Sequence, residues 1–488
     1  MSQARRIARN TLVVLLGNVS SYAFGFFFTM YVARYLGAEG YGILSFAIGF
    51  TSMFSILTDL GLQTLTSREV ARDKALAPKY VANVGALKIL LNTATFGLIA
   101  VIVSFLGYPT ETTSVVYLTA LSLVFGSFNG LFSAVFSGNE RMEYISLGQM
   151  LAAAINLSGG LFVIHYGHGV IGIAIVYAAS SLASLAFSLI VSTIRFVKPR
   201  VEVDRTFLRT AIGHAWPFTL SSFLFSAYYW TDTVVISFMK GDEAVGWYNA
   251  ATRLLSVLTF IPVAYFTAIF PVMSRLHLSS QELLRFTYER SMKYMMILGL
   301  PIAVGTTLLA DRIVAQVFGP DFSSAALALR ILVWSAVMFF AGNALTQLFD
   351  STNRQRTTTL VIGVCALGNL ILDLILTPIY SLYGTAAATV ANAALLLVLA
   401  YVLSCRFGYG LSRKIMLGTV VRVMVASSAM AFFVIYFHGL SMYILIPIAA
   451  LIYFAVLCLL GGIDKQDVLL VRQITGRNRA DVGRTSGE

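Results

Sequence analysis

The chain has 488 residues, of which 58% are hydrophobic and 11% are charged, and its formal net charge is +12. Soluble domains carry about 25% charged residues, so the composition excludes a water-exposed globular protein. The three cysteines lie in or beside apolar runs and do not suggest a disulfide framework. The sequence therefore predicts an all-α integral membrane protein.

Fourteen mostly apolar runs are close to the roughly 20 residues that a membrane-spanning helix needs. The first run follows Arg5, Arg6 and Arg9 and is too long for the apolar part of a signal peptide, so we expect it to remain as a span. In chain order, the predicted spans are 10–31, 41–62, 81–106, 114–136, 147–165, 169–194, 211–238, 246–273, 290–316, 325–349, 357–378, 383–405, 416–438 and 441–462.

The distribution of basic residues predicts the orientation of these spans. If the N-terminus is cytoplasmic, most of the 34 Lys and Arg residues fall in inner segments, and the outer loops hold only Arg34 and Lys240. This pattern obeys the positive-inside rule with an even number of spans and both termini in the cytoplasm. We interpret the basic charge as a topology signal of a multi-pass protein of the cell (inner or plasma) membrane, with no nucleic-acid partner.

A faint internal repeat divides the chain. Residues after the first predicted span recur 204 positions later, after the seventh, and a second set recurs 212–213 positions later: Gly37, Glu39 and Gly42 match Gly241, Glu243 and Gly246, and Asn156 and Gly172 match Asn369 and Gly384. Six spans per half preserve orientation, which predicts parallel repeats related by an axis along the membrane normal.

The repeat predicts two pseudo-symmetric six-helix lobes. The predicted parts are an N-lobe at 1–194, a cytoplasmic linker at 195–210, a C-lobe at 211–405, an appendage of spans 13 and 14 at 406–462, and a polar cytoplasmic tail at 463–488.

The motifs of common enzyme sites are absent from the sequence. It contains no P-loop, no HExxH and no Cys-x-x-Cys, and no set of residues resembles a nucleophile with its base. Charged residues inside the spans without such a set are most simply explained by a transporter or channel. We expect no catalytic residues and no cofactor.

Arg253 lies within the apolar stretch YNAATRLLSVLTFIPVAYFTAIFP, in the eighth predicted span. A charge near the bilayer centre costs about 2.5–3.5 kcal/mol on insertion scales, so such a side chain normally faces a bundle interior or a wet cavity. Its guanidinium stays protonated at ordinary pH and attracts anions. Two interpretations remain open, an anion-binding site and a structural ion pair with Asp232 of span seven.

Polar side chains on three spans lie at a common depth. Asn369 and Asp373 are four apart and share a helix face, as do Thr385 and Thr389. Counted from the outer surface, Asp232, Asp373 and Thr389 fall at a similar level. Their oxygens are the hard ligands that a small cation prefers, although Asn and Thr in spans also hydrogen-bond to neighbouring helices.

Two further pairs of charges are candidate gates. Asp59 and Lys88 lie in the inner thirds of spans two and three. The simpler interpretation is that Lys88 extends to the lipid headgroups, and the alternative is that the two residues pair as a cytoplasmic gate. Arg34 and Glu39 flank the first outer loop, where they form either an outer gate or a solvated rim.

Two segments carry a family resemblance. The start of the chain closely resembles the start of Wzx-type polysaccharide-biosynthesis flippases, in the segment ARNTLVVLLGNVSSYAFGFFFTMYVARYLGAEGYGILSFAIGFTSMFSILTDLGLQTLTSREVAR. The seventh-to-eighth span signature of the same group is similar to VGWYNAATRLLSVLTFIPVAYFTAIFPVMSRL. These flippases belong to the multidrug/oligosaccharidyl-lipid/polysaccharide exporter superfamily, and the likeness covers essentially the whole chain.

The resemblance implies a fold and a function. It implies two lobes around a central cavity that opens alternately to either side, and transfer of undecaprenyl- or dolichyl-pyrophosphate-linked sugars to the outer leaflet. In related peptidoglycan-precursor flippases, an arginine that matches Arg253 is taken to contact the pyrophosphate; we add Tyr248, Arg34 and Lys88 as candidate substrate contacts.

The sodium site of those relatives maps onto Asp232, Asn369, Asp373, Thr385 and Thr389, which implies Na⁺ or H⁺ as a coupling ion. The relatives also have arginines in span one, where this sequence has Tyr22 and Phe28. This departure favours the O-antigen-like branch of the family.

We therefore predict a flippase for lipid-linked oligosaccharide, driven by a cation gradient or the membrane potential. The expected partners are the lipid-linked oligosaccharide, membrane lipids, and glycosyltransferases and a polymerase of the same pathway, and we expect a monomer. One alternative is a cation-coupled exporter of small organic compounds, which would need a negatively charged cavity. The other is a membrane-embedded glycosyltransferase or polymerase, for which the predicted outer loops are too short.

Overall fold

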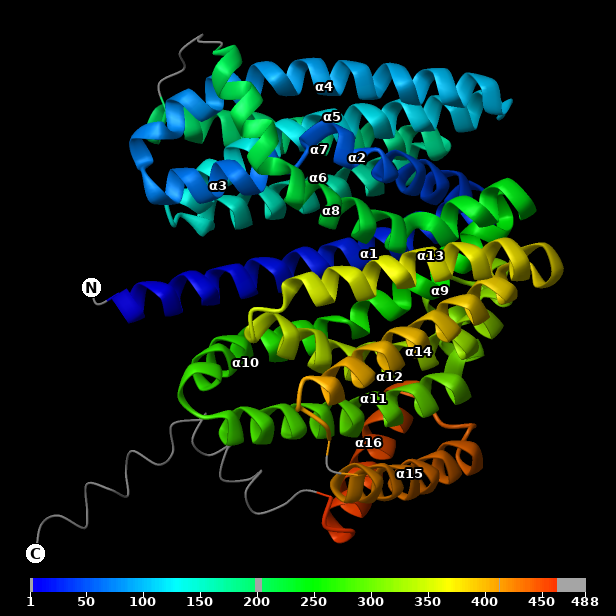
Figure 1. Ribbon diagram of the computed structural model, residues 1–488. Helices are drawn as coiled ribbons and strands as arrows, with labels where there is room; N and C mark the ends of the chain where they lie inside the picture. The colour runs from blue at the N-terminus through cyan, green and yellow to red at the C-terminus, as the bar shows by residue number, and fades with distance from the viewer. Residues whose placement is uncertain (1–2, 198–203, 412, 463–488) are drawn as a thin grey trace, which may run out of the picture. The chain divides into compact units, whose positions relative to one another are not determined.

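The computed structural model describes residues 3–197, 204–411 and 413–462 (Figure 1). Within these residues the chain forms α-helices and two short 3-10 helices and no strands. The predicted tail at 463–488 and residues 198–203 of the predicted linker lie outside the described residues. The α-helices are α1 (Gln3–Met53), α2 (Ser55–Asp59), α3 (Leu62–Arg72), α4 (Ala77–Leu106), α5 (Thr110–Gly138), α6 (Met142–Tyr166), α7 (Gly169–Arg195), α8 (Arg205–Lys240), α9 (Asp242–Leu258), α10 (Phe260–Ser279), α11 (Gln281–Val317), α12 (Ser323–Ser351), α13 (Gln355–Tyr380), α14 (Leu382–Arg406), α15 (Arg413–Tyr436) and α16 (Met442–Leu459).

The length and apolar composition of the helices confirm a multi-pass membrane protein of the all-α class. Over the described residues, 11 helices are long and apolar enough to cross a membrane, or 12 if the bent pair Ala23–Met53 and Ser55–Arg72 forms one span. Helices suit this role because all their backbone hydrogen bonds are made within the segment, which lipid cannot replace. The number fourteen and the orientation of the termini remain predictions.

The first two predicted spans fall on one long helix with a break. α1 is interrupted at Gly37, whose φ of 68° and ψ of −176° are not helical. Glycine adopts positive φ at little cost because it has no Cβ. The predicted outer loop between these spans is therefore reduced to the break at this residue.

The second predicted span ends in another break, between α2 and α3. Leu60 and Gly61 both have positive φ, 47° and 73°, and they separate the two helices. A helix that ends leaves its last carbonyl groups without intrahelical donors. Polar side chains from neighbouring helices bind at this point, as described below.

Helix α8 begins at a side-chain cap. The carboxylate of Asp204 accepts hydrogen bonds from the backbone N–H groups of Thr206 and Phe207, at 3.0 and 3.1 Å. The backbone N–H of Asp204 donates to Asn83 Oδ1 of α4 at 2.6 Å. These bonds satisfy free donors at the helix start and fix it against α4.

The chain forms two compact units, and each is described by itself. The first comprises Met1–Ala264, Asp311–Leu332 and Arg354–Leu396. The second comprises Tyr265–Ala310, Val333–Asn353 and Leu397–Glu488. Every candidate site residue named above lies in the first unit.

Within the first unit, α1 and α9 pack backbone to backbone. A Cβ added to Gly42 would lie 1.7 Å from the carbonyl oxygen of Asp242, and one added to Gly246 would lie 1.9 Å from that of Ala38. Small residues allow such close approach between helices in membranes. Any larger residue at either glycine would force the two helices apart.

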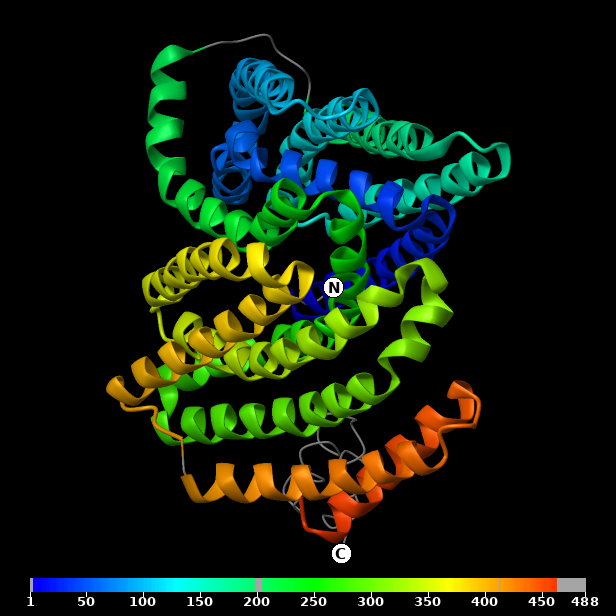
Figure 2. The same ribbon diagram turned by 90° about the vertical axis from the view of Figure 1, so that its right-hand side faces the viewer.

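Within the second unit, α15 and α16 lie side by side (Figure 2). The hydroxyl of Tyr453, a buried residue of α16, donates to the carbonyl of Ile297 in α11 at 2.7 Å. This bond ties the last described helix to the rest of its unit.

Candidate functional site

Asp232 of α8 is bonded from three other helices. The hydroxyl of Tyr248 in α9 donates to Oδ2, and Nδ2 of Asn369 in α13 donates to Oδ1. The hydroxyl of Thr389 in α14 donates to Oδ2 at 3.0 Å. Four helices therefore meet at this buried carboxylate. We call Asp232, Tyr248, Asn369, Asp373 and Thr389 the carboxylate cluster.

Asp373 is the second acid of the carboxylate cluster. Its side chain is 0% exposed, and its Oδ2 accepts a hydrogen bond of 3.1 Å from Asn369 Nδ2. One amide group thus bridges the two acids. The other oxygen of Asp373, Oδ1, is buried and has no hydrogen-bond partner among the described residues. A buried acceptor without a donor is costly and rare, which points to a group that is bound here in use.

The charge of the carboxylate cluster is not balanced by the chain. Among the described residues, neither Asp232 nor Asp373 forms an ion pair with a lysine or arginine. Two carboxylates held close together in a buried site cannot both remain ionised without a counter-charge. The arrangement therefore requires a cation or a proton.

A strip of polar side chains extends the carboxylate cluster along α13. The hydroxyls of Thr377 and Thr385 lie 2.8 Å apart and both residues are fully buried. Thr385 lies one helical turn before Thr389 on α14. No hydrogen bond joins Thr385 to Asp232 among the described residues. Thr377 did not appear among the predicted residues, although it continues the four-residue spacing of Asn369 and Asp373.

Arg253 lies on α9, five residues after Tyr248. Its Nε is buried and has no hydrogen-bond partner among the described residues. A Cβ added to Gly25 of α1 would lie 3.1 Å from Arg253 Nη2, so the guanidinium packs directly against this glycine. The ion pair with Asp232, one of the two interpretations from the sequence, is not formed between these described residues. The guanidinium keeps donor capacity for an anion.

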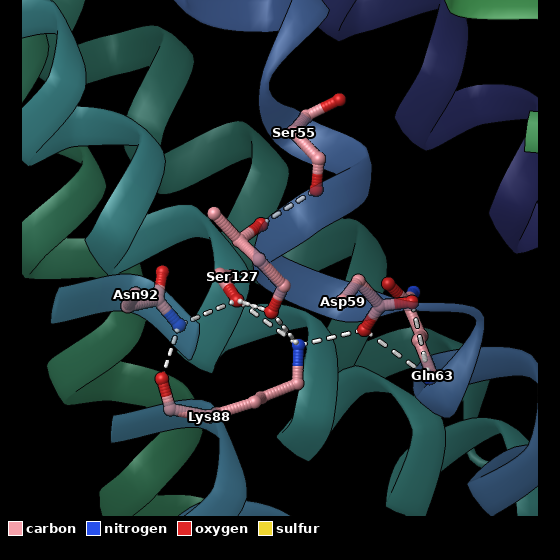
Figure 3. Close-up of polar contacts among 7 residues, drawn as sticks. Ser55, Asp59, Gln63, Lys88, Asn92 and Ser127 are labelled. Atoms are coloured by element: carbon pink, nitrogen blue, oxygen red, sulfur yellow. Dashed lines mark hydrogen bonds and ion pairs between the residues drawn. The ribbon is translucent and has the colours of Figure 1, made fainter. Parts of the chain in front are cut away.

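A second buried polar group surrounds Lys88 of α4, which is 0% exposed (Figure 3). Its ammonium donates to Asp59 Oδ1 at 2.6 Å, to Ser127 Oγ at 3.0 Å and to the carbonyl of Thr58 at 3.4 Å. Asn92 donates to the same Ser127 hydroxyl at 3.2 Å. We call these five residues the lysine cluster.

The lysine cluster closes the break between α2 and α3. The carbonyl of Thr58 is at the end of α2 and accepts from Ser127 at 3.0 Å as well as from Lys88. Asp59 also accepts from the backbone N–H of Gln63, near the start of α3 (Figure 3). The lysine and its neighbours thus replace the donors that the broken helix lost.

Of the two interpretations that the sequence left for Lys88, the favoured one, extension to the headgroups, is wrong, and the other, a pair with Asp59, is formed. The ion pair measures 2.6 Å, and the lysine is enclosed by α2, α4 and α5. Extension to the headgroups was plausible because sequence depth alone does not show which way a lysine turns. The roles of Asp59 as a gate and of Lys88 as a substrate contact stay predictions.

Arg34 and Glu39, both on α1, lie apart from the carboxylate cluster. Nε of Arg34 donates to the carbonyl of Val317 at 2.8 Å, and Nη2 donates to the carbonyl of Gln316. A cation at the last carbonyls of a helix complements its dipole, and here it caps α11. Glu39 is exposed. Their roles in substrate binding and gating remain predictions.

The part of the chain that the structure describes has no group of three or more His, Cys, Asp or Glu side chains that could hold a metal ion. The carboxylate cluster has two acids and otherwise neutral oxygens. Such a set suits a small hard ion of low charge better than a transition metal.

These features define a membrane protein of the transporter class, with charged groups buried between its helices. Residues 7–277, more than half of the chain, match the family described as polysaccharide biosynthesis protein, and residues 217–375 match the MatE family. The chain belongs to the polysaccharide biosynthesis protein family.

Two relatives come from the archaeon Haloferax volcanii. The protein named "Probable flippase AglR" is 25% identical over 405 residues, which cover 81% of this chain and 83% of that protein. The protein named "Probable low-salt glycan biosynthesis flippase Agl15" is 23% identical over 399 residues, which cover 80% and 82%.

Among solved structures, the lipid II flippase MurJ in its inward closed conformation matches with a TM-score of 0.76 at 18% identity. The match covers 92% of this chain and 99% of that chain. At this identity the likeness establishes the fold alone.

Proposed function

We propose that the protein is a flippase that moves a polyprenyl-pyrophosphate-linked oligosaccharide, an O-antigen or surface polysaccharide repeat unit, to the outer leaflet of the cell membrane. The family, the names of the two archaeal relatives and the MurJ-like fold support this proposal. Its partners are then membrane lipids and the glycosyltransferases and polymerase that act on the same lipid before and after transfer, and it acts as a monomer.

The main support for the proposal is that Arg253, a cation, has donor capacity that no described residue uses. Arg253 is a permanent cation within a predicted span, its buried Nε has no partner among the described residues, and its guanidinium packs directly against Gly25. Guanidinium groups recognise phosphate oxygens through paired hydrogen bonds. As the headgroup leaves water, such fixed donors replace its hydration, while the polyprenyl tail remains in the lipid.

The carboxylate cluster is the proposed binding site for the ion that drives transport. Two acids, one amide and hydroxyl groups fit Na⁺, and the unpartnered Oδ1 of Asp373 is a ligand position that the chain leaves open. A proton on the same pair would also remove the imbalance of charge. Either ion, moving inward as sugar moves outward, would make the protein an antiporter. Asp232 and Asp373 hold the ion, and Asn369 orients both acids.

The proposed architecture has fourteen spans, two six-helix lobes at 1–194 and 211–405, a central cavity with alternating access, and both termini in the cytoplasm. The α1–α9 contact supports the repeat. Gly42 contacts Asp242, and Gly246 contacts Ala38. The two glycines are 204 residues apart in the sequence, and so are their two partners, Ala38 and Asp242. A contact that is reciprocal in this way is expected where a two-fold axis passes between equivalent helices.

The match to the MatE family keeps one rival open, a cation-coupled exporter of small organic compounds. Such a protein would bind cationic dyes and would not need Arg253. The alternative function as a glycosyltransferase or polymerase is not supported by the two relatives, which are named flippases. Product analysis separates these classes, since an enzyme changes covalent bonds in the lipid-linked sugar and a flippase changes only its leaflet.

The test is a leaflet-resolved translocation assay in proteoliposomes with a polyprenyl-pyrophosphate-linked sugar. We expect Arg253→Ala to lower the rate at least tenfold, and Arg253→Lys to recover only part of it because an ammonium lacks the planar pair of donors. Arg330→Ala is the matched control, since this arginine also has a buried Nε without a partner among the described residues, but it is partly exposed and pairs with Asp311. Full activity of both Arg253 variants would refute the proposal.

A further inference from the structure

Helix α9 connects the carboxylate cluster to Arg253. It is helical from Asp242 to Leu258 without an internal break. Tyr248 is 2% exposed and directs its hydroxyl to Asp232, and Arg253 follows five residues later against Gly25. A continuous helix of this length moves as one body, so a change at Tyr248 displaces the guanidinium too.

The hydroxyl of Tyr248 uses an oxygen that a cation would need. Oδ2 of Asp232 accepts from Tyr248 and from Thr389, whose own hydroxyls lie 3.1 Å apart. A hydroxyl proton that points at a carboxylate oxygen occupies the lone pairs through which the same oxygen would bind a cation. A bound cation and these donated hydrogen bonds therefore compete.

We propose that Tyr248 is a positioning residue that couples the cation to the pyrophosphate. Without the cation, its bond to Asp232 fixes α9, and with it Arg253, against α8. When a cation takes Asp232, that bond is lost, and α9 is no longer tied to α8 at this point while it keeps its packing against α1. The inference rests on the proposed function, because it assigns Arg253 to the anion. Thr389 donates to the same oxygen but lies on α14, which carries no part of the anion site.

Two other tyrosines, the buried Tyr453 and the half-buried Tyr108, show what a purely structural hydroxyl does. Tyr453 donates to the backbone carbonyl of Ile297, an uncharged acceptor. Tyr108 shares a hydrogen bond of 3.0 Å with Ser237 of α8, the helix that also carries Asp232. Tyr108 is thus a matched control, since its loss removes a tyrosine bond to the same helix away from the acids.

The experiment measures two ligands on purified full-length protein: Na⁺ by calorimetry, and farnesyl pyrophosphate with and without Na⁺. In the wild type and in Tyr108→Phe, we expect Na⁺ to change the affinity for farnesyl pyrophosphate by about fivefold or more, the usual range of coupling between sites. In Tyr248→Phe both ligands should still bind, Na⁺ several-fold more tightly, with the coupling factor reduced to about one.

A second variant separates coupling from simple disruption of the cluster. Thr389→Val removes the other hydroxyl on the same oxygen and should alter Na⁺ affinity while leaving the coupling factor near the wild-type value. The inference is overturned if Tyr248→Phe keeps the wild-type factor, if it binds Na⁺ more weakly, or if the wild type shows no coupling. Failure of the proposed function looks different, because the wild type would then bind Na⁺ but not farnesyl pyrophosphate.

Discussion

The two buried polar clusters of the first unit differ in the origin of their positive charge. In the lysine cluster, the chain supplies it, since Lys88 pairs with Asp59 and fills the acceptors at the end of α2. In the carboxylate cluster, two acids share one amide and no basic side chain pairs with them among the described residues. The first cluster contains its own counter-charge, although Asn92 Oδ1 has no hydrogen-bond partner among the described residues. The second contains none, and we propose that a cation or a proton supplies it.

The predicted internal repeat sharpens this contrast. The residue 204 positions before Asp232 is Phe28, and the residue 213 positions before Asp373 is Gly160. In the structure these two counterparts are also in contact, because a Cβ on Gly160 would lie 2.5 Å from the ring of Phe28. The positions of Asp232 and Asp373 in one predicted half correspond in the other half to Phe28 and Gly160, an aromatic ring packed on a glycine. The ion is expected to act on one half only.

The largest change in stability is expected at the lysine cluster. Lys88→Met leaves Asp59 charged and unpaired and should lower the free energy of unfolding by about 3 kcal/mol, near the low end for a broken buried pair because Asp59 is only partly buried. The double variant Lys88→Met/Asp59→Asn should recover most of the loss. Thermal unfolding in detergent measures both. Equal midpoints for the single and double variants would show that the pair has no energetic role.

The next largest effect is expected where α1 meets α9. Gly42→Ala and Gly246→Ala each place a Cβ inside the partner backbone and should destabilise the protein by about 1–3 kcal/mol, the usual range for overpacking. The two losses should be similar because the contacts are reciprocal. Gly97→Ala is the control, since nothing lies within 4 Å of its added Cβ. Clearly unequal losses would argue against the two-fold relation.

The smallest change in stability is expected at the carboxylate cluster, and its sign is opposite to that at Lys88. Asp373→Asn removes one of two like charges, so in Na⁺-free buffer at neutral pH we expect an unfolding midpoint equal to or slightly above that of the wild type. Added Na⁺ should raise the wild-type midpoint and leave that of the variant unchanged, because only a ligand that binds the folded state stabilises it. A variant that Na⁺ still stabilises would place the ion elsewhere.

The sequence was sufficient for the fold class and for much of the candidate site. Apolar runs mark the helices, and the four-residue spacing of Asn369 and Asp373 places them on one face. Counting depth along separate spans correctly brought Asp232, Asp373 and Thr389 together. These features are local or follow from the thickness of the bilayer, so one sequence contains them.

Three features depend on contacts that depth does not reveal. Tyr248, predicted as a substrate contact, directs its hydroxyl to Asp232, which is on the preceding helix. Arg34 caps a helix that ends more than 280 residues later in the chain. The burial of Lys88 depends on the break at Leu60 and Gly61, which frees a carbonyl for it. Helix rotation and helix breaks decide such contacts, and hydropathy gives neither.

The most direct test is the rate of translocation of a polyprenyl-pyrophosphate-linked sugar in proteoliposomes, measured with and without an inward Na⁺ gradient for the wild type and Asp373→Asn. We expect the gradient to accelerate the wild type at least fivefold and to have no effect on the variant. An Asp373→Asn protein that responds to the gradient as the wild type does would contradict it.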